Sequence, residues 1–389
     1  MLPNTVPHDI DKYFFNRENE IRHIKKQINT IRQDLPNQIL INGYKGVGKT
    51  FLVKKIINDM ESDILSIYID LSKIYGINQE ITEEEILKEL LNNINNYLTQ
   101  DNRLNWIRER IYSFIHSMMT YKYELDETID IFNLTIPKIK QDYSKLSKLV
   151  MELLQEIVNE SSINGIILVF DEFHLIENLE NPGTFLMLMR SSMKDQKNVC
   201  YIFTGRINSS DGIINIMNCY GEIGSRIPYF RIENFTRDET IRYIEEKQPN
   251  LNFTQEGYEN FYECTLGIPQ YINSFCNVLN ENEVYNYENV NKAFLDNANQ
   301  IIGFELNIWA TFDSIQKEIF KLLCEYNELT LYDLIDKTEV SNKEMHIAIY
   351  PLLNRYITYK TYAATYQISF KMLELWLKHE KEIKGIYPI

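Results

Sequence analysis

The sequence contains few cysteines, and they form no arrangement that would hold a metal or a disulfide framework. There are five in 389 residues, with no C-x-x-C pair among Cys200, Cys219, Cys264, Cys276 and Cys324. We expect them to be reduced, buried and unreactive. No apolar run approaches the ~18 residues that a membrane-spanning helix needs, and the first residues lack the apolar core of a secretory signal. These absences predict a cytoplasmic protein with no membrane partner.

Positive charge is also scarce. The chain has 40 Lys and Arg against 55 Asp and Glu, a formal net charge of −15. Such a balance argues against a broad nucleic-acid or anionic-membrane surface, although a local basic patch is compatible with it. Residues 310–389 carry 10 basic and 11 acidic residues, which leaves 30 and 44 for residues 1–309. The C-terminal part is therefore less repulsive to a polyanion than the rest.

Glycine is limited to 14 positions, and three of them fall within one short run. That run, Gly43-Tyr44-Lys45-Gly46-Val47-Gly48-Lys49-Thr50, fits G-x-x-x-x-G-K-[ST]. A strand pattern at 38–42 precedes it and a helix pattern starting at Phe51 follows, which is the context in which backbone N–H groups surround a phosphate chain. We predict that residues 43–51 bind the nucleotide, with Lys49 reaching the β- and γ-phosphates and Thr50 holding Mg²⁺.

Further strand patterns alternate with helical ones along the first part of the chain. The strands cover 65–71, 165–171, 199–205 and 226–232, and an inserted segment at about 73–145 is mostly helical in pattern. The alternation predicts an α/β fold, in which a parallel sheet carries helices on both faces. We assign residues 1–235 to this core.

Beyond the core the pattern becomes helical. Residues 236–306 begin with the capping box Thr236-Arg237-Asp238-Glu239 and are predicted to form a small helical lid. Residues 307–389 combine three short helix patterns, ending at 341–354, with strand patterns at 356–360 and 366–370. Three helices followed by a hairpin predict a winged helix-turn-helix domain.

Two carboxylates end the most apolar strand. Asp171 stands where a metal-binding carboxylate is needed, and Glu172 is the candidate to orient or deprotonate the attacking water. Thr204 ends the next strand, where its hydroxyl either contacts the γ-phosphate or the water, or is satisfied by local backbone. Arg226 is either an arginine finger for a neighbouring subunit or a surface arginine in a salt bridge. We interpret His174 as a polar residue at the rim.

Together these motifs resemble the archaeal-type ATPase family, in the branch of P-loop proteins shared by origin-recognition-like AAA+ ATPases and STAND NTPases. Gly43–Thr50 matches the Walker A motif and Asp171-Glu172-Phe173 the Walker B motif. Thr204-Gly205 resembles sensor 1, with Arg206 in place of serine, and Ser225-Arg226 resembles an arginine finger. ATP and Mg²⁺ are the ligands that this resemblance implies.

The resemblance also implies contacts outside the core motifs. Phe15-Asn16-Arg17-Glu18 is similar to the family's F-x-G-R-E motif, which places Phe15 and Arg17 near the adenine, although Asn16 replaces the glycine. Gly267-Ile268-Pro269 resembles the G-x-P lid motif, which assigns Pro269 to the nucleotide site. No arginine occurs in 270–280, where many AAA+ ATPases carry sensor 2. This departure favours a STAND-like switch with slow turnover.

Two functions stay open from the sequence. The first is an ATP-hydrolysing molecular switch whose nucleotide state rearranges the lid and the winged helix. The alternative is a DNA-associated ATPase of a replicon or mobile element, which assembles as homo-oligomers with Arg226 acting in trans. The predicted recognition helix at 341–355 has few cations, chiefly Lys343 and Arg355, so DNA and protein are both candidate partners. A non-enzymatic scaffold is disfavoured because Glu172 is intact.

Overall fold

The computed structural model describes residues 1–78, 80–98, 106, 109, 113, 128–131, 134–137, 144–206, 227–354, 357–361 and 363–388. The chain divides into two compact units. The sheet unit consists of Arg17–Gly43 and Lys49–Ile232, and the helical unit consists of Met1–Asn16, Tyr44–Gly48 and Glu233–Ile389.

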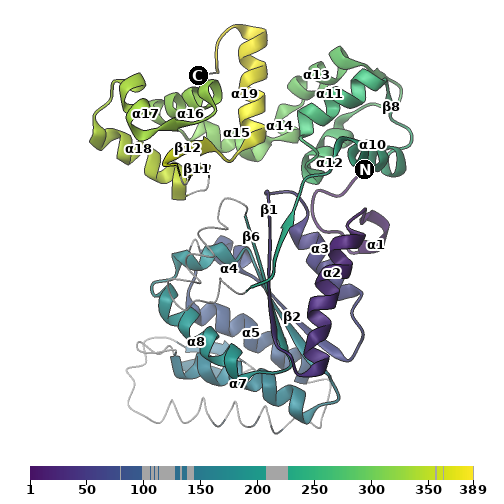
Figure 1. The fold of residues 1–389 in the computed structure, drawn as a ribbon, viewed down its shortest axis with the longest axis vertical. Helices are drawn as coiled ribbons and strands as arrows, with labels where there is room; N and C mark the ends of the chain where they lie inside the picture. The colour runs from purple at the N-terminus through teal and green to yellow at the C-terminus, as the bar shows by residue number, and fades with distance from the viewer. Residues whose placement is uncertain are drawn as a thin grey trace. The chain divides into compact units, whose positions relative to one another are not determined.

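The sheet unit is built on five parallel strands in the order β2-β5-β6-β1-β7 (Figure 1). These strands are β1 (Asn37–Gly43), β2 (Ile64–Asp70), β5 (Gly165–Asp171), β6 (Val199–Arg206) and β7 (Tyr229–Ile232). Every residue of β5 is buried because its unbroken apolar run is covered on both faces, as expected for an internal parallel strand. The predicted parallel α/β sheet is therefore confirmed.

Helices cover both faces of this sheet. On one face lie α2 (Glu18–Ile28) and α3 (Lys49–Asn58), which contact β1; on the other lie α5 (Glu83–Leu98), α7 (Ser144–Glu160) and α8 (Pro182–Asp195) (Figure 1). Apolar residues of α5 recur at helical spacing, and five of them are buried in the core of the sheet unit: Ile86, Leu87, Leu90, Leu91 and Ile94. Shorter helical segments in this unit are η1 (Asn29–Gln33), α4 (Leu71–Asn78) and η3 (Phe173–Asn178).

One part of the predicted helical insertion is extended instead. Within 73–145 the described residues include α4 and α5, but also the antiparallel pair β3 (Thr128–Ile131) and β4 (Leu134–Pro137). Both strands are rich in Thr and Ile, whose branched side chains favour extended backbone. The helical pattern of the surrounding residues did not predict this pair.

The helical unit begins with α1 (Ile10–Tyr13) and continues after the sheet with a group of helices. These are α10 (Arg237–Lys247), α11 (Gln255–Thr265), α12 (Pro269–Val278), α13 (Tyr287–Asp296), α14 (Ala298–Ile301) and α15 (Gly303–Ala310), with the short pair β8 (Asn252–Phe253) and β9 (Val284–Tyr285). The capping box predicted at Thr236 and Glu239 is formed. Stacked and edge-on aromatic rings, such as Phe261 on Phe275, fill the core of this helical group.

The C-terminal segment has its own apolar core. It contains α16 (Ser314–Tyr326), β10 (Leu329–Thr330), α17 (Leu331–Thr338), α18 (Asn342–Asn354), β11 (Thr358–Lys360), β12 (Thr365–Ile368) and α19 (Lys371–Lys384). The strands form one sheet in the order β10-β12-β11. Three helices are thus followed by an antiparallel hairpin, which is the element order predicted for this segment.

The cysteines that the structure describes behave as expected. Cys200, Cys264, Cys276 and Cys324 are buried and free, and burial raises the pKa of each thiol. Cys219 lies outside the described residues. Across the described part of the chain, no helix is both long enough and apolar enough to cross a bilayer.

Candidate functional site

The glycine-rich loop joins the end of β1 to the start of α3. Gly46 has a φ of +84° and Gly48 a φ of +98°, a left-handed conformation that side-chain-bearing residues rarely adopt. At the start of the loop, the buried Asn42 accepts a hydrogen bond of 2.7 Å from the backbone N–H of Gly43 through its Oδ1. The sequence thus forms a tight turn directly before the amino end of a helix, where free N–H groups favour an anion.

Lys49 is the first residue of α3, and its side chain is almost fully buried at 5 % exposure. Its Nζ donates a hydrogen bond of 3.2 Å to the carbonyl oxygen of Gly43. A buried ammonium is costly unless it is hydrogen-bonded or neutralised by an anion. The position therefore suits a cation that faces phosphate.

Asp171, at the carboxyl end of β5, receives hydrogen bonds from three hydroxyl groups. Oδ2 accepts from Thr50 Oγ1 at 2.8 Å and from the hydroxyl of Tyr68 on β2, and Oδ1 accepts from Thr204 Oγ1 on β6. Burial, followed by the nearby Asp171 carboxylate, raises the pKa of the Tyr68 hydroxyl, so it stays a neutral donor. The three strands and α3 thus hold one carboxylate, which is 3 % exposed.

The groups around Asp171 fit a magnesium ion. A hydroxyl and a carboxylate are oxygen ligands, the kind that Mg²⁺ prefers, and Mg²⁺ usually takes only one or two protein groups together with water and phosphate. Accordingly, the described residues contain no cluster of three or more His, Cys, Asp or Glu that would cage a metal alone. Thr50 and Asp171, both predicted metal ligands, are brought together, and Tyr68 joins them.

The backbone turns sharply at Glu172, directly after β5. This residue has φ 55° and ψ 43°, the left-handed region, and it precedes η3. Its backbone N–H donates a 3.0 Å hydrogen bond to Thr204 Oγ1, so Thr204 links the two acidic residues. Glu172 Oε2 also lies 3.5 Å from Nε2 of His174. The prediction that His174 is a rim residue is wrong, because the first turn of η3 buries it to 1 % exposure.

The predicted adenine contacts fall in different parts of the chain. Phe15, in the helical unit, packs edge-on against Phe235 and Tyr243, with ring centroids 5.6 and 5.2 Å apart. Asn16 has a φ of 62°, a conformation that Asn tolerates better than most residues, which explains how it replaces a glycine. Arg17, 8 % exposed, forms a 3.1 Å ion pair with Glu20.

Residues of the helical unit also contact the glycine-rich loop. The N–H of Gln270, in the first turn of α12 after Pro269, donates a 3.2 Å hydrogen bond to the carbonyl oxygen of Gly46. A Cβ on Gly46 would lie only 2.7 Å from Gln270 Oε1, so the loop and α12 approach closely. Lys45 Nζ lies 3.1 Å from the centroid of the Phe304 ring in α15, a cation–π contact.

Arg226, the predicted arginine finger, lies outside the described residues. Sequence reasoning missed Tyr68, Asn42 and Gln270. A polar residue at the end of a strand was a usable signal for Asn42. Tyr68 acts through the pairing of β2 with β5 and Gln270 through its backbone, and neither leaves a local sequence signal.

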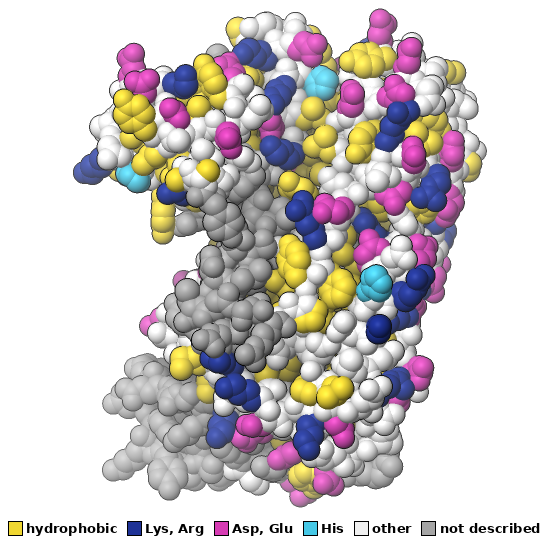
Figure 2. Space-filling view, in the orientation of Figure 1, with side chains coloured by type: hydrophobic (Ala, Val, Ile, Leu, Met, Phe, Trp, Pro, Cys, Tyr) yellow, Lys and Arg dark blue, Asp and Glu magenta, His cyan; other side chains and the backbone are white. Residues whose placement is uncertain are grey.

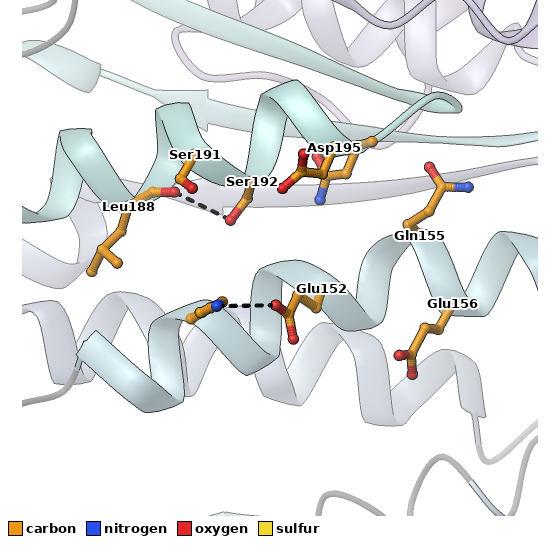
Figure 3. A pocket seen from close by; sticks show the side chains of 9 residues that line it. Glu152, Gln155, Glu156, Leu188, Ser191, Ser192 and Asp195 are labelled. Atoms are coloured by element: carbon orange, nitrogen blue, oxygen red, sulfur yellow. Dashed lines mark hydrogen bonds and ion pairs between the residues drawn. The ribbon is translucent and has the colours of Figure 1, made fainter.

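A separate pocket of about 310 Å³ lies between α7 and α8 (Figure 3). It is close to the start of β6, where Gln155 of α7 accepts hydrogen bonds from the N–H groups of Lys197 and Asn198. Glu152, Glu156 and Asp195 line it, and their carboxylates disfavour phosphate. Ligands of parallel α/β sheets bind at the opposite, carboxyl edge, so this pocket is not the nucleotide site.

A family model described as an ATPase domain predominantly from Archaea matches residues 14–275, more than half of the chain. The chain belongs to this archaeal ATPase family. It is therefore a P-loop ATPase. No curated protein sequence matched the chain.

Solved structures share the fold of this family member. A Walker-type ATPase of Pyrococcus abyssi is similar with a TM-score of 0.63 and 18 % identity, over 94 % of this chain and 97 % of that one. The ORC2 protein of Aeropyrum pernix in its ADP form has a TM-score of 0.52 and 11 % identity, over 98 % and 96 %. The ORC1 protein of Aeropyrum pernix in complex with DNA has a TM-score of 0.50 and 11 % identity, over 97 % and 95 %.

Proposed function

We propose that this ATPase is a Mg²⁺-dependent molecular switch that couples bound ATP and its hydrolysis to the lid and the C-terminal segment. The observation that supports it best is the cluster at Asp171, where Thr50, Tyr68 and Thr204 all donate to one carboxylate. Thr50 lies one residue beyond Lys49, so the metal-binding groups directly follow the phosphate-facing cation in α3.

In this proposal each residue has a defined task. Lys49 neutralises the β- and γ-phosphates, and the Thr50 hydroxyl and Asp171 carboxylate hold Mg²⁺, which would offset negative charge on the phosphates. Glu172 accepts a proton from water as the water oxygen bonds to the γ-phosphorus and the bond to the departing ADP oxygen breaks. Thr204 fixes the backbone of Glu172 relative to Asp171. Phe15, Arg17 and Pro269 are proposed to lie near the nucleotide base.

The switch rests on contacts made by the loop within the helical unit. Gly46 accepts a hydrogen bond from Gln270 at the start of α12, and Lys45 lies over Phe304 in α15. A phosphate chain that draws the N–H groups of residues 44–48 toward itself would reorient this backbone, and with it the Gly46 carbonyl and the Lys45 side chain that make these contacts. ATP would then stabilise one arrangement of α12 and α15 over another, which is what a nucleotide-dependent switch requires.

Hydrogen exchange can test this proposal. We expect Mg²⁺ with a non-hydrolysable ATP analogue to protect residues 44–48 and to change exchange in α12 and α15, whereas ADP gives a different pattern. We also expect phosphate release from ATP that stops in EDTA. Equal exchange in the ATP-analogue and ADP states would contradict the switch, and metal-independent turnover would contradict the assigned metal site.

A second proposed function is a DNA-associated ATPase that forms homo-oligomers, with Arg226 completing a neighbour's site. Two observations favour it: the C-terminal segment has the helix and hairpin order of a winged helix-turn-helix domain, and the similar ORC1 structure contains DNA. Yet the surface over α17 and α18 in Figure 2 mixes hydrophobic, acidic and basic side chains. On α18, Ile347 and Tyr350 are each 64 % exposed beside Lys343 and His346, around a groove of about 590 Å³.

DNA retention at several salt concentrations separates the two functions. A DNA-associated ATPase should bind duplex DNA more tightly with the ATP analogue and lose affinity steeply with salt, because phosphate contacts release counterions. Its molecular mass in solution should also increase with the ATP analogue, because the proposed function includes homo-oligomers. A chain that stays unbound to DNA and constant in size would leave the first function as the better explanation.

A further inference from the structure

Tyr68 carries an inference that goes beyond the Walker motifs. It lies on β2, a strand whose residues pair in parallel with β5, and Asp70 lies opposite Asp171 in that register. The Tyr68 hydroxyl donates to Asp171 Oδ2, the same oxygen that accepts the Thr50 hydroxyl. Its ring contacts Lys54 of α3, with Nζ 5.1 Å from the ring centroid.

These contacts limit how the carboxylate can turn. An ionised carboxylate offers about four lone-pair sites, and hydroxyl groups of Thr50, Tyr68 and Thr204 occupy three of them. Thr50 is itself a candidate metal ligand, so in the described part of the site only Tyr68 and Thr204 orient Asp171 without serving as ligands in the proposed function. Tyr68 fixes Oδ2, the oxygen on the Thr50 side.

We propose that Tyr68 is a positioning residue for magnesium: it holds the Asp171 carboxylate in the orientation that binds the metal together with Thr50. This inference rests on the proposed magnesium site. Residues that hydrogen-bond to a metal ligand fix its orientation, and their removal typically weakens metal affinity by about 10–100-fold. The described interactions of the Tyr68 side chain are with Asp171, Thr50 and Lys54, and none is with Lys49 or the glycines of the loop, so we expect nucleotide affinity without metal not to depend on its hydroxyl.

The test is Tyr68→Phe, which removes the hydroxyl and keeps the ring. Binding of a fluorescent ADP in EDTA should equal that of the wild type. Mn²⁺ binding to the protein–ADP complex, followed by electron paramagnetic resonance, should weaken by about tenfold. The Mg²⁺ concentration for half-maximal ATP turnover should rise by a similar factor, while turnover at saturating Mg²⁺ recovers most of the wild-type value.

Tyr201→Phe is the matched control. Tyr201 lies on β6 in the same sheet, and its hydroxyl donates a 2.7 Å hydrogen bond to Gln196, away from Asp171. We expect this variant to lose some thermal stability and to keep wild-type Mn²⁺ affinity. An unchanged Mn²⁺ affinity in Tyr68→Phe, or equal losses in both variants, would overturn the role of Tyr68.

The same data separate this inference from the proposed function. If turnover and nucleotide binding of the wild type do not depend on a divalent metal, the proposed magnesium site is wrong, and so is the role of Tyr68. If the wild type needs the metal but Tyr68→Phe responds to it normally, only the role of Tyr68 is wrong. Metal-free melting curves of both variants show whether the fold itself has changed.

Discussion

The carboxyl end of the sheet and the contacts of residues 44–48 within the helical unit use different kinds of interaction. At the end of β5, hydroxyl groups from three elements converge on the side chain of Asp171. In the helical unit, α12 contacts the loop through the backbone of Gln270 and Gly46, and α15 contacts it through one aromatic ring. The first region depends on side-chain hydroxyl groups, and the second on one backbone hydrogen bond and one cation–π contact. Substitutions should therefore change chemistry in the first region and coupling in the second.

The largest effect is expected at Glu172. Glu172→Gln keeps the shape and the backbone N–H that binds Thr204, but it removes the group that accepts a proton from water. We expect ATP turnover to fall by about 10²–10⁴-fold, the usual contribution of a general base, with ATP affinity preserved. Single-turnover phosphate release and a separate binding titration measure the two quantities.

Glu180→Gln is the control for this prediction, because Glu180 is an exposed carboxylate just before α8. It should leave turnover unchanged. If Glu172→Gln hydrolyses ATP at the wild-type rate, Glu172 has no part in the reaction. The claim that substitutions in the first region change chemistry would then lose its main support.

The next largest effect is expected at Lys49. Lys49→Ala removes the buried ammonium at the start of α3, and we expect ATP affinity to fall on the order of 10²-fold, because removing one partner of a buried charge pair costs about 2–5 kcal/mol. A fluorescent ATP analogue measures the affinity. Lys55→Ala, which removes a cation of the same helix that pairs with Asp59, should change it little. Equal affinities of wild type and Lys49→Ala would show that the loop does not bind phosphate.

A smaller effect is expected in the helical unit. Phe304→Ala removes the ring beneath Lys45, a contact worth ~0.5–1 kcal/mol at an exposed site. We expect turnover close to that of the wild type, but a change of about 2–5-fold in how strongly the ATP analogue alters hydrogen exchange in α12 and α15. This outcome would separate coupling from chemistry.

Tyr326→Ala provides a matched comparison for Phe304→Ala. Tyr326 is also a half-exposed aromatic residue of the helical unit with a cation over its ring, Lys337, at 4.2 Å, but it does not contact the loop. It should leave the nucleotide response intact. Equal changes in the two variants would mean that loss of an aromatic side chain, and not the loop contact, causes the effect.

The two regions also differ in how far the sequence predicted them. Apolar runs in the sequence predicted the strands, because a buried strand needs them. The carboxylate at the end of one such run predicted Asp171 as a metal ligand, so both predictions came from local sequence patterns. The role of Tyr68 needs β2 to lie beside β5, and that neighbourhood is not encoded locally. The Gln270 contact uses a backbone N–H that every residue except proline has. His174 was misplaced because the turn at Glu172 that buries it could not be foreseen.

The smallest effect tests whether stability of the helical unit can change without altering chemistry. Thr236 caps α10 through a reciprocal capping box with Glu239, and Thr236→Ala should lower the free energy of unfolding by about 1 kcal/mol. Because neither residue belongs to the sheet unit, ATP turnover at a temperature well below unfolding should match the wild type. Thermal or urea denaturation measures the first quantity and a steady-state assay the second. A large loss of turnover in this variant would show that the fold of the helical unit, and not only its contacts with residues 44–48, supports the reaction proposed at Asp171 and Glu172.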